Sequence, residues 1–169
     1  MQNTPLKSTA ISLFWVLFIS HNGITQVDNI LAMDISKVKK IDTLLHFSEK
    51  YADQYNLDTA LIYGNKALNL SIDEQLLSKE AKSHYHLGYA YDLNGQLISA
   101  INHYEDSRKL YEKLGNTEEV ANCMNAKGVA AYFKGDFGLA LEYLTELYDK
   151  NGNISKAYDT QSSLSLIHI

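Results

Sequence analysis

The chain of 169 residues is long enough for one domain with a hydrophobic core of its own. Its net charge of −5 and its single arginine, Arg108, argue against a nucleic-acid partner, which clustered Lys and Arg would bind. The single cysteine, Cys123, excludes an internal disulfide and a cysteine-based zinc site.

Residues 1–25 have the pattern of a signal peptide. Lys7 is the only charged residue among them, and a run of apolar or small residues follows at 10–19. That run is too short to cross a bilayer, which takes about 20 residues. Small residues at 23 and 25 predict cleavage near Thr25–Gln26, export to the periplasm or cell envelope, and a mature chain without a membrane span. An uncleaved N-terminal anchor is the alternative.

A short linker is predicted at 26–35, and from there on apolar residues recur at three- and four-residue spacing. This is helical periodicity, and no stretch alternates as a strand would. Breaks rich in Gly, Asn and Asp divide the pattern into about seven helices, and short connections between helices favour antiparallel neighbours. We expect four residues to start helices, because their side-chain oxygens can cap free amide groups: Asp58, Asp73, Thr117 and Asp136.

The chain repeats itself with a period of about 40 residues. Small residues recur at this spacing, in three sets: Ala60, Ala100 and Ala140; Gly88 and Gly128; Gly95 and Gly135. A fixed period in this range predicts stacked supersecondary units. Because glycine inside a helix costs about 1 kcal/mol relative to alanine, Gly88 and Gly128 predict close approach between neighbouring helices.

In the middle unit the repeated residues resemble the tetratricopeptide repeat (TPR) family. They are Leu87-Gly88, Tyr91, Gly95 at the turn, Ala100, and Tyr104 in the aromatic slot. The resemblance spans about residues 36–160 and implies an all-α, right-handed solenoid of antiparallel helix pairs. It implies about three repeats, at 41–80, 81–120 and 121–156, and the start of a fourth at 157–162. Residues 163–169 are interpreted as a tail of non-native origin.

This period is longer than that of the usual TPR, which is about 34 residues, so we expect a longer second helix in each pair. Arrays with this long period resemble those of bacterial signalling proteins, where they often precede a histidine kinase or a DNA-binding domain. The resemblance therefore implies a fragment from the N-terminal sensing or docking part of an envelope signalling protein. A free-standing periplasmic assembly adaptor is the alternative. A third hypothesis is an all-α enzyme acting on an envelope polymer through Asp42, Glu49 and Asp53.

A TPR solenoid lines its concave groove with the first helix of each pair, so the resemblance implies a groove that binds a protein or peptide. The aromatic and amide side chains expected there suit peptide backbones. In the first unit the expected positions are Asp42, Leu45, Glu49 and Asp53; in the second, Lys82, Tyr85, Tyr89 and Asp92; in the third, Asn122, Asn125, Val129 and Tyr132.

No catalytic residue, cofactor or metal site is predicted. His84 and His86 are two residues apart and would point to different sides of a helix, so with His103 they lack a ligand pattern. Cys123 is one candidate nucleophile, but a buried thiol between helices is the favoured interpretation. Paired carboxylates such as Glu118–Glu119 are explained by helix capping.

A solenoid needs a polar terminal helix that covers its last apolar face. The sequence predicts no such helix at the C-terminal end of the repeats, so we expect self-association through that end.

Overall fold

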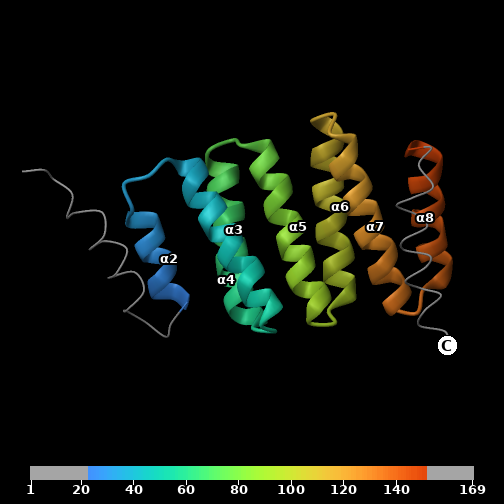
Figure 1. Cartoon of the computed structure of the whole chain (residues 1–169), viewed down its shortest axis with the longest axis horizontal. Helices are drawn as coiled ribbons and strands as arrows, with labels where there is room; N and C mark the ends of the chain where they lie inside the picture. The colour runs from blue at the N-terminus through green and yellow to red at the C-terminus, as the bar shows by residue number, and fades with distance from the viewer. Residues whose placement is uncertain (1–22, 152–169) are drawn as a thin grey trace, which may run out of the picture.

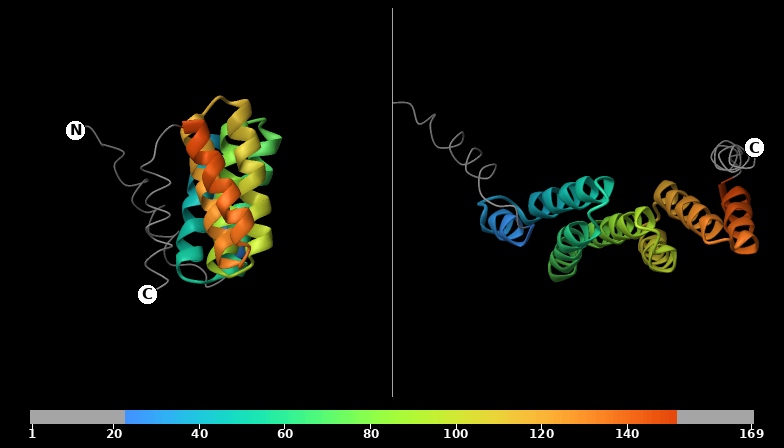
Figure 2. Two further views of the ribbon diagram at one scale, coloured as in Figure 1. Left: turned by 90° about the vertical axis from the view of Figure 1, so that its right-hand side faces the viewer. Right: turned by 90° about the horizontal axis from the view of Figure 1, so that it is seen from below.

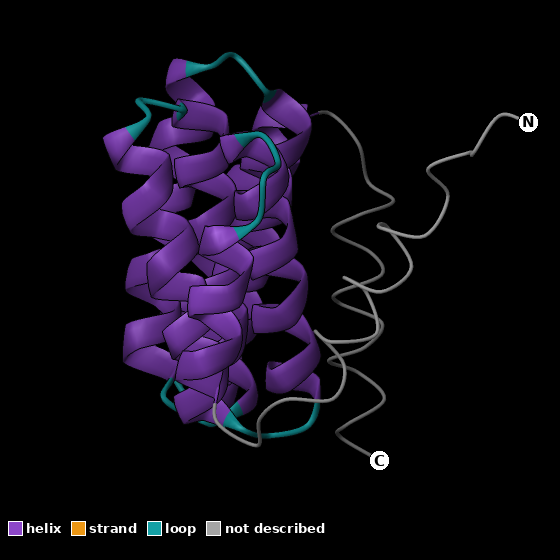
Figure 3. Cartoon of the chain, turned by 90° about the vertical axis from the view of Figure 1, so that its left-hand side faces the viewer, coloured by secondary structure: helices purple, strands orange, loops and turns teal. Residues whose placement is uncertain are grey.

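The computed structural model describes residues 23–151, which form seven α-helices and no strand (Figures 1 and 3). The helices are α2 (Gly23–Ala32), α3 (Lys37–Asp53), α4 (Leu57–Asp73), α5 (Leu77–Leu93), α6 (Leu97–Lys113), α7 (Thr117–Phe133) and α8 (Phe137–Asn151). The predicted all-α solenoid is therefore confirmed. Among these helices none is long and apolar enough to cross a membrane. The predicted cleavage site falls within α2, and the start of a fourth repeat and the tail lie outside the described residues.

The helices divide the 40-residue period into two equal halves. Each helix from α3 to α7 has 17 residues, and the connections between them are all equally short. The prediction of a longer second helix is wrong, because both helices of a pair are equally long. The pairs begin at Lys37, Leu77 and Thr117, slightly before the repeat boundaries assigned from the sequence.

Every turn between α3 and α8 has the same geometry. Its middle residue has a left-handed backbone, with φ of 56° at Tyr55, 54° at Gln75, 73° at Gly95, 67° at Gly115 and 83° at Gly135. In the turn after α5, the N–H of Gly95 donates to Asp92 O at 2.9 Å and the next N–H donates to Tyr91 O at 2.9 Å. These bonds satisfy the last carbonyls of the helix, so the turn ends one helix and reverses the chain.

Several of the helices have a polar side chain that caps their N-terminal end. Ser36, Asn56 and Asn116 accept hydrogen bonds from backbone N–H groups of the first turn, and Asp136 accepts one from Leu139 N at 3.2 Å. Asp136 therefore has the predicted capping role. The prediction for Asp73 is wrong, since Asp73 is the last residue of α4 and α5 begins after the following turn.

Consecutive helices pack against each other along the chain, and α3 also packs against α5. The first helices of the pairs (α3, α5 and α7) lie in one row and the second helices (α4, α6 and α8) lie in another (Figure 2). Small residues at the repeated positions allow this packing: Ala60, Ala100 and Ala140 are all buried. Buried serines fill the remaining seams, as Ser107 shows by donating to Ala81 O of the preceding helix at 2.8 Å.

Residues 26–35 were predicted as a linker, but most of them belong to α2. This helix packs against α3 and α4 and buries Val27 and Ile30 among their apolar residues. The Gln26 side chain accepts hydrogen bonds from the hydroxyls of Tyr51 and Tyr63, at 3.3 and 2.7 Å. The helix therefore covers the N-terminal end of the array, which would otherwise expose its core to water.

Candidate functional site

The face formed by α3, α5 and α7, here called the first-helix face, contains the residues predicted to bind a partner. Lys82 is exposed, and the other predicted residues of α5 and α7 are half-buried. They lie along two neighbouring first helices: Tyr85, Tyr89 and Asp92 on α5, and Asn122, Asn125, Val129 and Tyr132 on α7.

One predicted position in the first unit is wrong. Leu45 is only 1% exposed and lies in a core cluster with Tyr63 of α4 and with Val27 and Ile30 of α2. Its side chain is therefore unavailable to a partner, because α2 adds apolar residues that the sequence did not assign to the fold. Asp42, Glu49 and Asp53 remain exposed or half-buried.

Two polar contacts join α3 to α5 across the first-helix face. The Tyr89 hydroxyl donates to Asp53 Oδ1 at 2.7 Å, and Lys79 Nζ forms an ion pair with Asp42 Oδ1 at 2.5 Å. Both acids thus have structural partners within the array. This counts against the hypothesis that Asp42 and Asp53 act together in catalysis, since a catalytic pair must face a substrate across a cleft.

Tyr85 and Tyr89 of α5 lie in a negative electrostatic environment. Burial raises the pKa of Tyr85, and the charges of Glu119, Asp92 and Glu49 raise it further. These three carboxylates belong to α7, α5 and α3. The hydrogen bond to Asp53 and, to a lesser extent, burial and the charge of Asp53 raise the pKa of Tyr89 to about 12. Carboxylates from all three first helices therefore converge on two tyrosine side chains.

The α7 part of the face is held by its own contacts. Asn122 Nδ2 donates to Glu119 Oε2 at 3.1 Å, within the same helix. The Tyr132 ring meets the ring of Phe137 edge to face, with centroids 5.3 Å apart. These contacts fix the orientation of an amide and an aromatic ring on a rigid helix, as a preformed binding surface requires.

The histidines pair across helices rather than along one. His84 of α5 and His103 of α6 have their Nδ1 atoms 3.1 Å apart, and Tyr91 stacks on His103 with centroids 5.3 Å apart. Burial lowers the pKa of both histidines, so at neutral pH one neutral ring can donate to the other. His86 belongs to neither contact, and burial lowers its pKa to about 4. Among the described residues no group of three metal-binding side chains converges.

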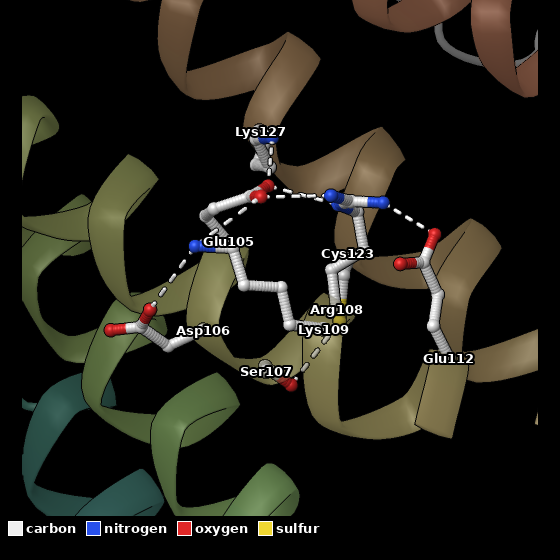
Figure 4. Close-up of polar contacts among 8 residues, drawn as sticks. All are labelled: Glu105, Asp106, Ser107, Arg108, Lys109, Glu112, Cys123 and Lys127. Atoms are coloured by element: carbon white, nitrogen blue, oxygen red, sulfur yellow. Dashed lines mark hydrogen bonds and ion pairs between the residues drawn. The ribbon is translucent and has the colours of Figure 1, made fainter. Parts of the chain in front are cut away.

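An ion-pair network joins α6 to α7 (Figure 4). Glu105 accepts two hydrogen bonds from Arg108, at 2.8 and 2.9 Å, and a third from Lys127 of α7. Lys127 also lies 4.0 Å from the ring centre of Tyr143 in α8. Lys127 is only 5% exposed, and its charge is partnered by the Glu105 carboxylate and the Tyr143 ring. The sequence did not predict this network, because Glu105 and Lys127 belong to different helices and lie far apart along the chain.

Cys123 is a structural thiol. It is fully buried in α7 and donates to Ser107 Oγ of α6 at 3.3 Å. Burial is the main cause that raises the pKa of this thiol to about 11. A nucleophilic cysteine needs an accessible thiolate near neutral pH, so Cys123 does not fit that role.

Residues 79–150 match the sequence profile of a family described as the tetratricopeptide repeat. The fold is similar to the crystal structure of the TPR domain of Arabidopsis FLU, with a TM-score of 0.62 and 15% sequence identity. That likeness covers 68% of this chain and 97% of the other. No curated protein sequence matches the chain. At this identity the structural likeness concerns the fold alone, which is a TPR solenoid.

Proposed function

We propose that the chain is a non-enzymatic scaffold whose first-helix face binds a peptide segment of a protein partner. The observation that carries this proposal is the composition of that face. Tyr85, Tyr89 and Tyr132 lie there half-buried, beside amide and carboxylate side chains. Tyrosines held on rigid helices favour binding, because they offer large contact area at a low cost in conformational entropy.

A peptide-display selection tests this proposal. Random 12-residue peptides are selected on the immobilised chain, and the winners are then measured against the double variant Tyr89→Ala/Tyr132→Ala. We expect the double variant to bind at least about ten-fold more weakly, because each tyrosine anchor contributes of the order of 1 kcal/mol or more. The matched control is Glu142→Ala on α8, an exposed residue of a second helix. Failure to enrich any peptide, or equal binding by the double variant, would contradict the proposal.

Export is a separate part of the proposal. We propose that residues 1–25 direct the chain to the periplasm or cell envelope, on the basis of their apolar run and lack of acidic residues. A fusion of residues 1–40 to a reporter enzyme that is active only outside the cytoplasm tests this directly. Sequencing the N-terminus of the processed fusion then distinguishes cleavage near Gln26 from an uncleaved anchor. An inactive reporter would remove export from the proposal and leave the scaffold function unaffected.

We further propose that the array is the sensing or docking part of a larger envelope signalling protein, of the histidine-kinase or regulator kind. The support is the 40-residue period, which resembles that of arrays in bacterial signalling proteins. Reading the gene through its 3′ end in source DNA tests this. A downstream membrane span and kinase-like domain would support the proposal, and a stop codon without them would favour a free-standing adaptor.

A further inference from the structure

One histidine from each helix of the central pair lies in the seam between α5 and α6. The Nδ1 atoms of His84 and His103 are 3.1 Å apart, and the centroids of the two rings are 5.3 Å apart. Tyr91 of α5 stacks on the His103 ring, and both histidines are half-buried. The two helices therefore contact each other through two side chains that can each take up a proton.

The neighbouring helix pairs have apolar or aromatic residues at these two positions of the 40-residue period. One period earlier, Leu44 of α3 and Tyr63 of α4 are fully buried in the same core cluster. One period later, the positions are occupied by Met124 of α7, which is also buried, and by Tyr143 of α8. The repeat therefore folds without an ionisable pair at this place, and packing alone does not account for the two histidines.

The geometry of the pair limits how many protons it can hold. A neutral imidazole carries a hydrogen on one of its two nitrogens, so at 3.1 Å one Nδ1 donates and the other accepts. A first added proton can enter at the Nε2 of the donor ring and leaves this bond in place. A second added proton has to occupy the accepting Nδ1, where two hydrogens and two positive charges then face each other. The contact therefore tolerates one added proton and not two.

The charged groups around the pair offset this effect only in part. Burial is the largest cause acting on both rings and lowers their pKa, whereas Asp106 raises the pKa of both and Glu80 raises that of His84. Asp106 is exposed and also lies 3.8 Å from Lys109, so solvent and a neighbouring cation weaken its influence. Among the described residues, the charges that act on the two rings belong to α5 and α6 themselves, and none belongs to α3, α4 or α7.

We propose that the His84–His103 pair is an acid-sensitive contact that holds α5 against α6 at neutral pH and loosens in mildly acidic solution. Histidine in the unfolded chain has its ordinary pKa of 6.5. Because the folded pair takes up fewer protons, its contribution to stability is complete above pH 6.5 and is lost as the pH falls below that value.

The same contact connects acid to the first-helix face. Tyr85 of that face packs against Tyr104 of α6, with ring centroids 5.3 Å apart. Loosening of α5 from α6 therefore changes the setting of a residue proposed to bind a partner. We expect partner binding to weaken in acid, a consequence that rests on the proposed scaffold function.

Hydrogen exchange of the full chain at pH 6 and at pH 5 tests the contact locally. The variant His84→Leu/His103→Tyr has the residues that α3 and α4 place at these positions, and His103→Asn keeps a hydrogen-bonding group near Nδ1 that takes up no proton. We expect the protection factors of α5 and α6 to fall about ten-fold further in the wild-type chain than in either variant, because the folded pair refuses one proton. The matched control His46→Asn removes an exposed histidine of α3 and should behave like the wild-type chain.

Proton uptake by the wild-type chain is a second measurement that needs no variant to fold. NMR signals of the histidine rings, followed from pH 7.5 to pH 5, report how many protons the pair binds while the chain is folded. We expect one proton to be bound by the folded pair and the second only on unfolding. Uptake of two protons by the folded chain would overturn the inference, and so would an equal fall of protection in the wild-type chain and in the folded variants.

Peptide binding separates this inference from the scaffold function. Peptides enriched in the display selection are measured at pH 7.5 and at pH 5.5, and we expect the wild-type chain to lose at least about three-fold more affinity than His84→Leu/His103→Tyr, because its binding-competent fraction falls. Equal losses would overturn the connection to the first-helix face. A selection that enriches no peptide would count against the scaffold function alone, since the exchange and NMR results do not depend on a ligand.

Discussion

The turn residues with a left-handed backbone have a conformational free-energy cost that differs from turn to turn along the chain. The same turn geometry is occupied by Gln75 in one turn and by Gly95 in the next, with φ of 54° and 73°. A residue with a Cβ pays about 1–2 kcal/mol for this backbone, whereas glycine adopts it freely. The turns after α3 and α4 are therefore strained and the three that follow are not.

We expect Gln75→Gly to raise the free energy of unfolding by about 0.5–1 kcal/mol, since relief of strain exceeds the extra entropy that glycine gives the unfolded chain. Gly95→Ala is the reverse control. No atom lies within 4 Å of the Cβ that it would add, so backbone strain alone should lower stability by about 1 kcal/mol. Urea unfolding followed by circular dichroism measures both. Changes of the same sign in the two variants would contradict the explanation.

Glu105 makes stability depend on pH in the acid range. Its hydrogen bond from Arg108, with the charges of Arg108 and Lys127, lowers the pKa of Glu105 from its ordinary value near 4.5 to about 2. A lowered pKa in the folded state means that this contribution is complete above pH 4.5 and is lost as the pH falls toward 2. We expect the urea midpoint to drop over this window, and to drop less in Glu105→Gln. An identical pH profile in the variant would show that the network contributes nothing to stability.

At the scale of the helix pair, the recurring glycines have different surroundings. An added Cβ at Gly88 would lie 2.7 Å from the Tyr104 ring, whereas at Gly128 the nearest atom is a terminal carbon of Leu144 at 3.2 Å. Tyr104 is fully buried and cannot move aside, but the end of a leucine side chain can. The two positions are thus equivalent in sequence and unequal in packing.

We expect Gly88→Ala to destabilise the fold by about 1–3 kcal/mol, because overpacking against Tyr104 outweighs the gain in helix propensity. Gly128→Ala should stay within about 1 kcal/mol of the wild-type chain. The double variant Gly88→Ala/Tyr104→Leu removes the ring that clashes and should recover part of the loss relative to Tyr104→Leu alone. Denaturant unfolding of the four variants measures these differences, and equal losses at the two glycines would contradict the assignment.

The 40-residue period was sufficient to predict the helix pairs, since Ala60, Ala100 and Ala140 repeat a packing position. The sequence did not reveal that each period consists of two equally long helices, because the turns at Tyr55 and Gln75 lack the glycine that marks the other three turns. Helix α2 was missed because the apolar residues before it dominate the pattern of the N-terminus. Cross-helix contacts, such as the His84–His103 pair, depend on helix rotation, which spacing along one helix does not reveal.

At the scale of the first-helix face, the predicted residues of α5 and α7 lie on neighbouring helices, and Leu45 was wrong. Its burial follows from α2, so the error has the same origin as the missing helix. The ion pairs of Glu105 were also beyond the sequence, because the contact with Lys127 forms only when α6 and α7 are packed.

At the scale of the whole molecule, the two ends of the described array differ. The N-terminal end is covered by α2, whereas α8 presents an apolar surface in which Phe137 is 59% exposed and Leu141 is 63% exposed. Two repeats earlier, the same positions are Leu57 and Leu61 of α4, which pack in one cluster with Ala90 of α5. Because α8 has the same position in its repeat as α4, we expect the surface around Phe137 and Leu141 to pack against another helix.

We expect the chain to self-associate through this surface, because burial of a phenylalanine and a leucine contributes about 1.5–3 kcal/mol each. Sedimentation velocity at increasing concentration should show species larger than the monomer, and the variant Phe137→Glu/Leu141→Glu should remain monomeric. Ile98→Glu is the matched control, since Ile98 is 65% exposed on α6 but lies outside this surface. A wild-type chain that stays monomeric at high concentration would contradict the assignment, and so would dissociation by Ile98→Glu alone. Dissociation by the α8 variant alone would show that the repeat register, rather than apolar exposure in general, determines where this chain associates.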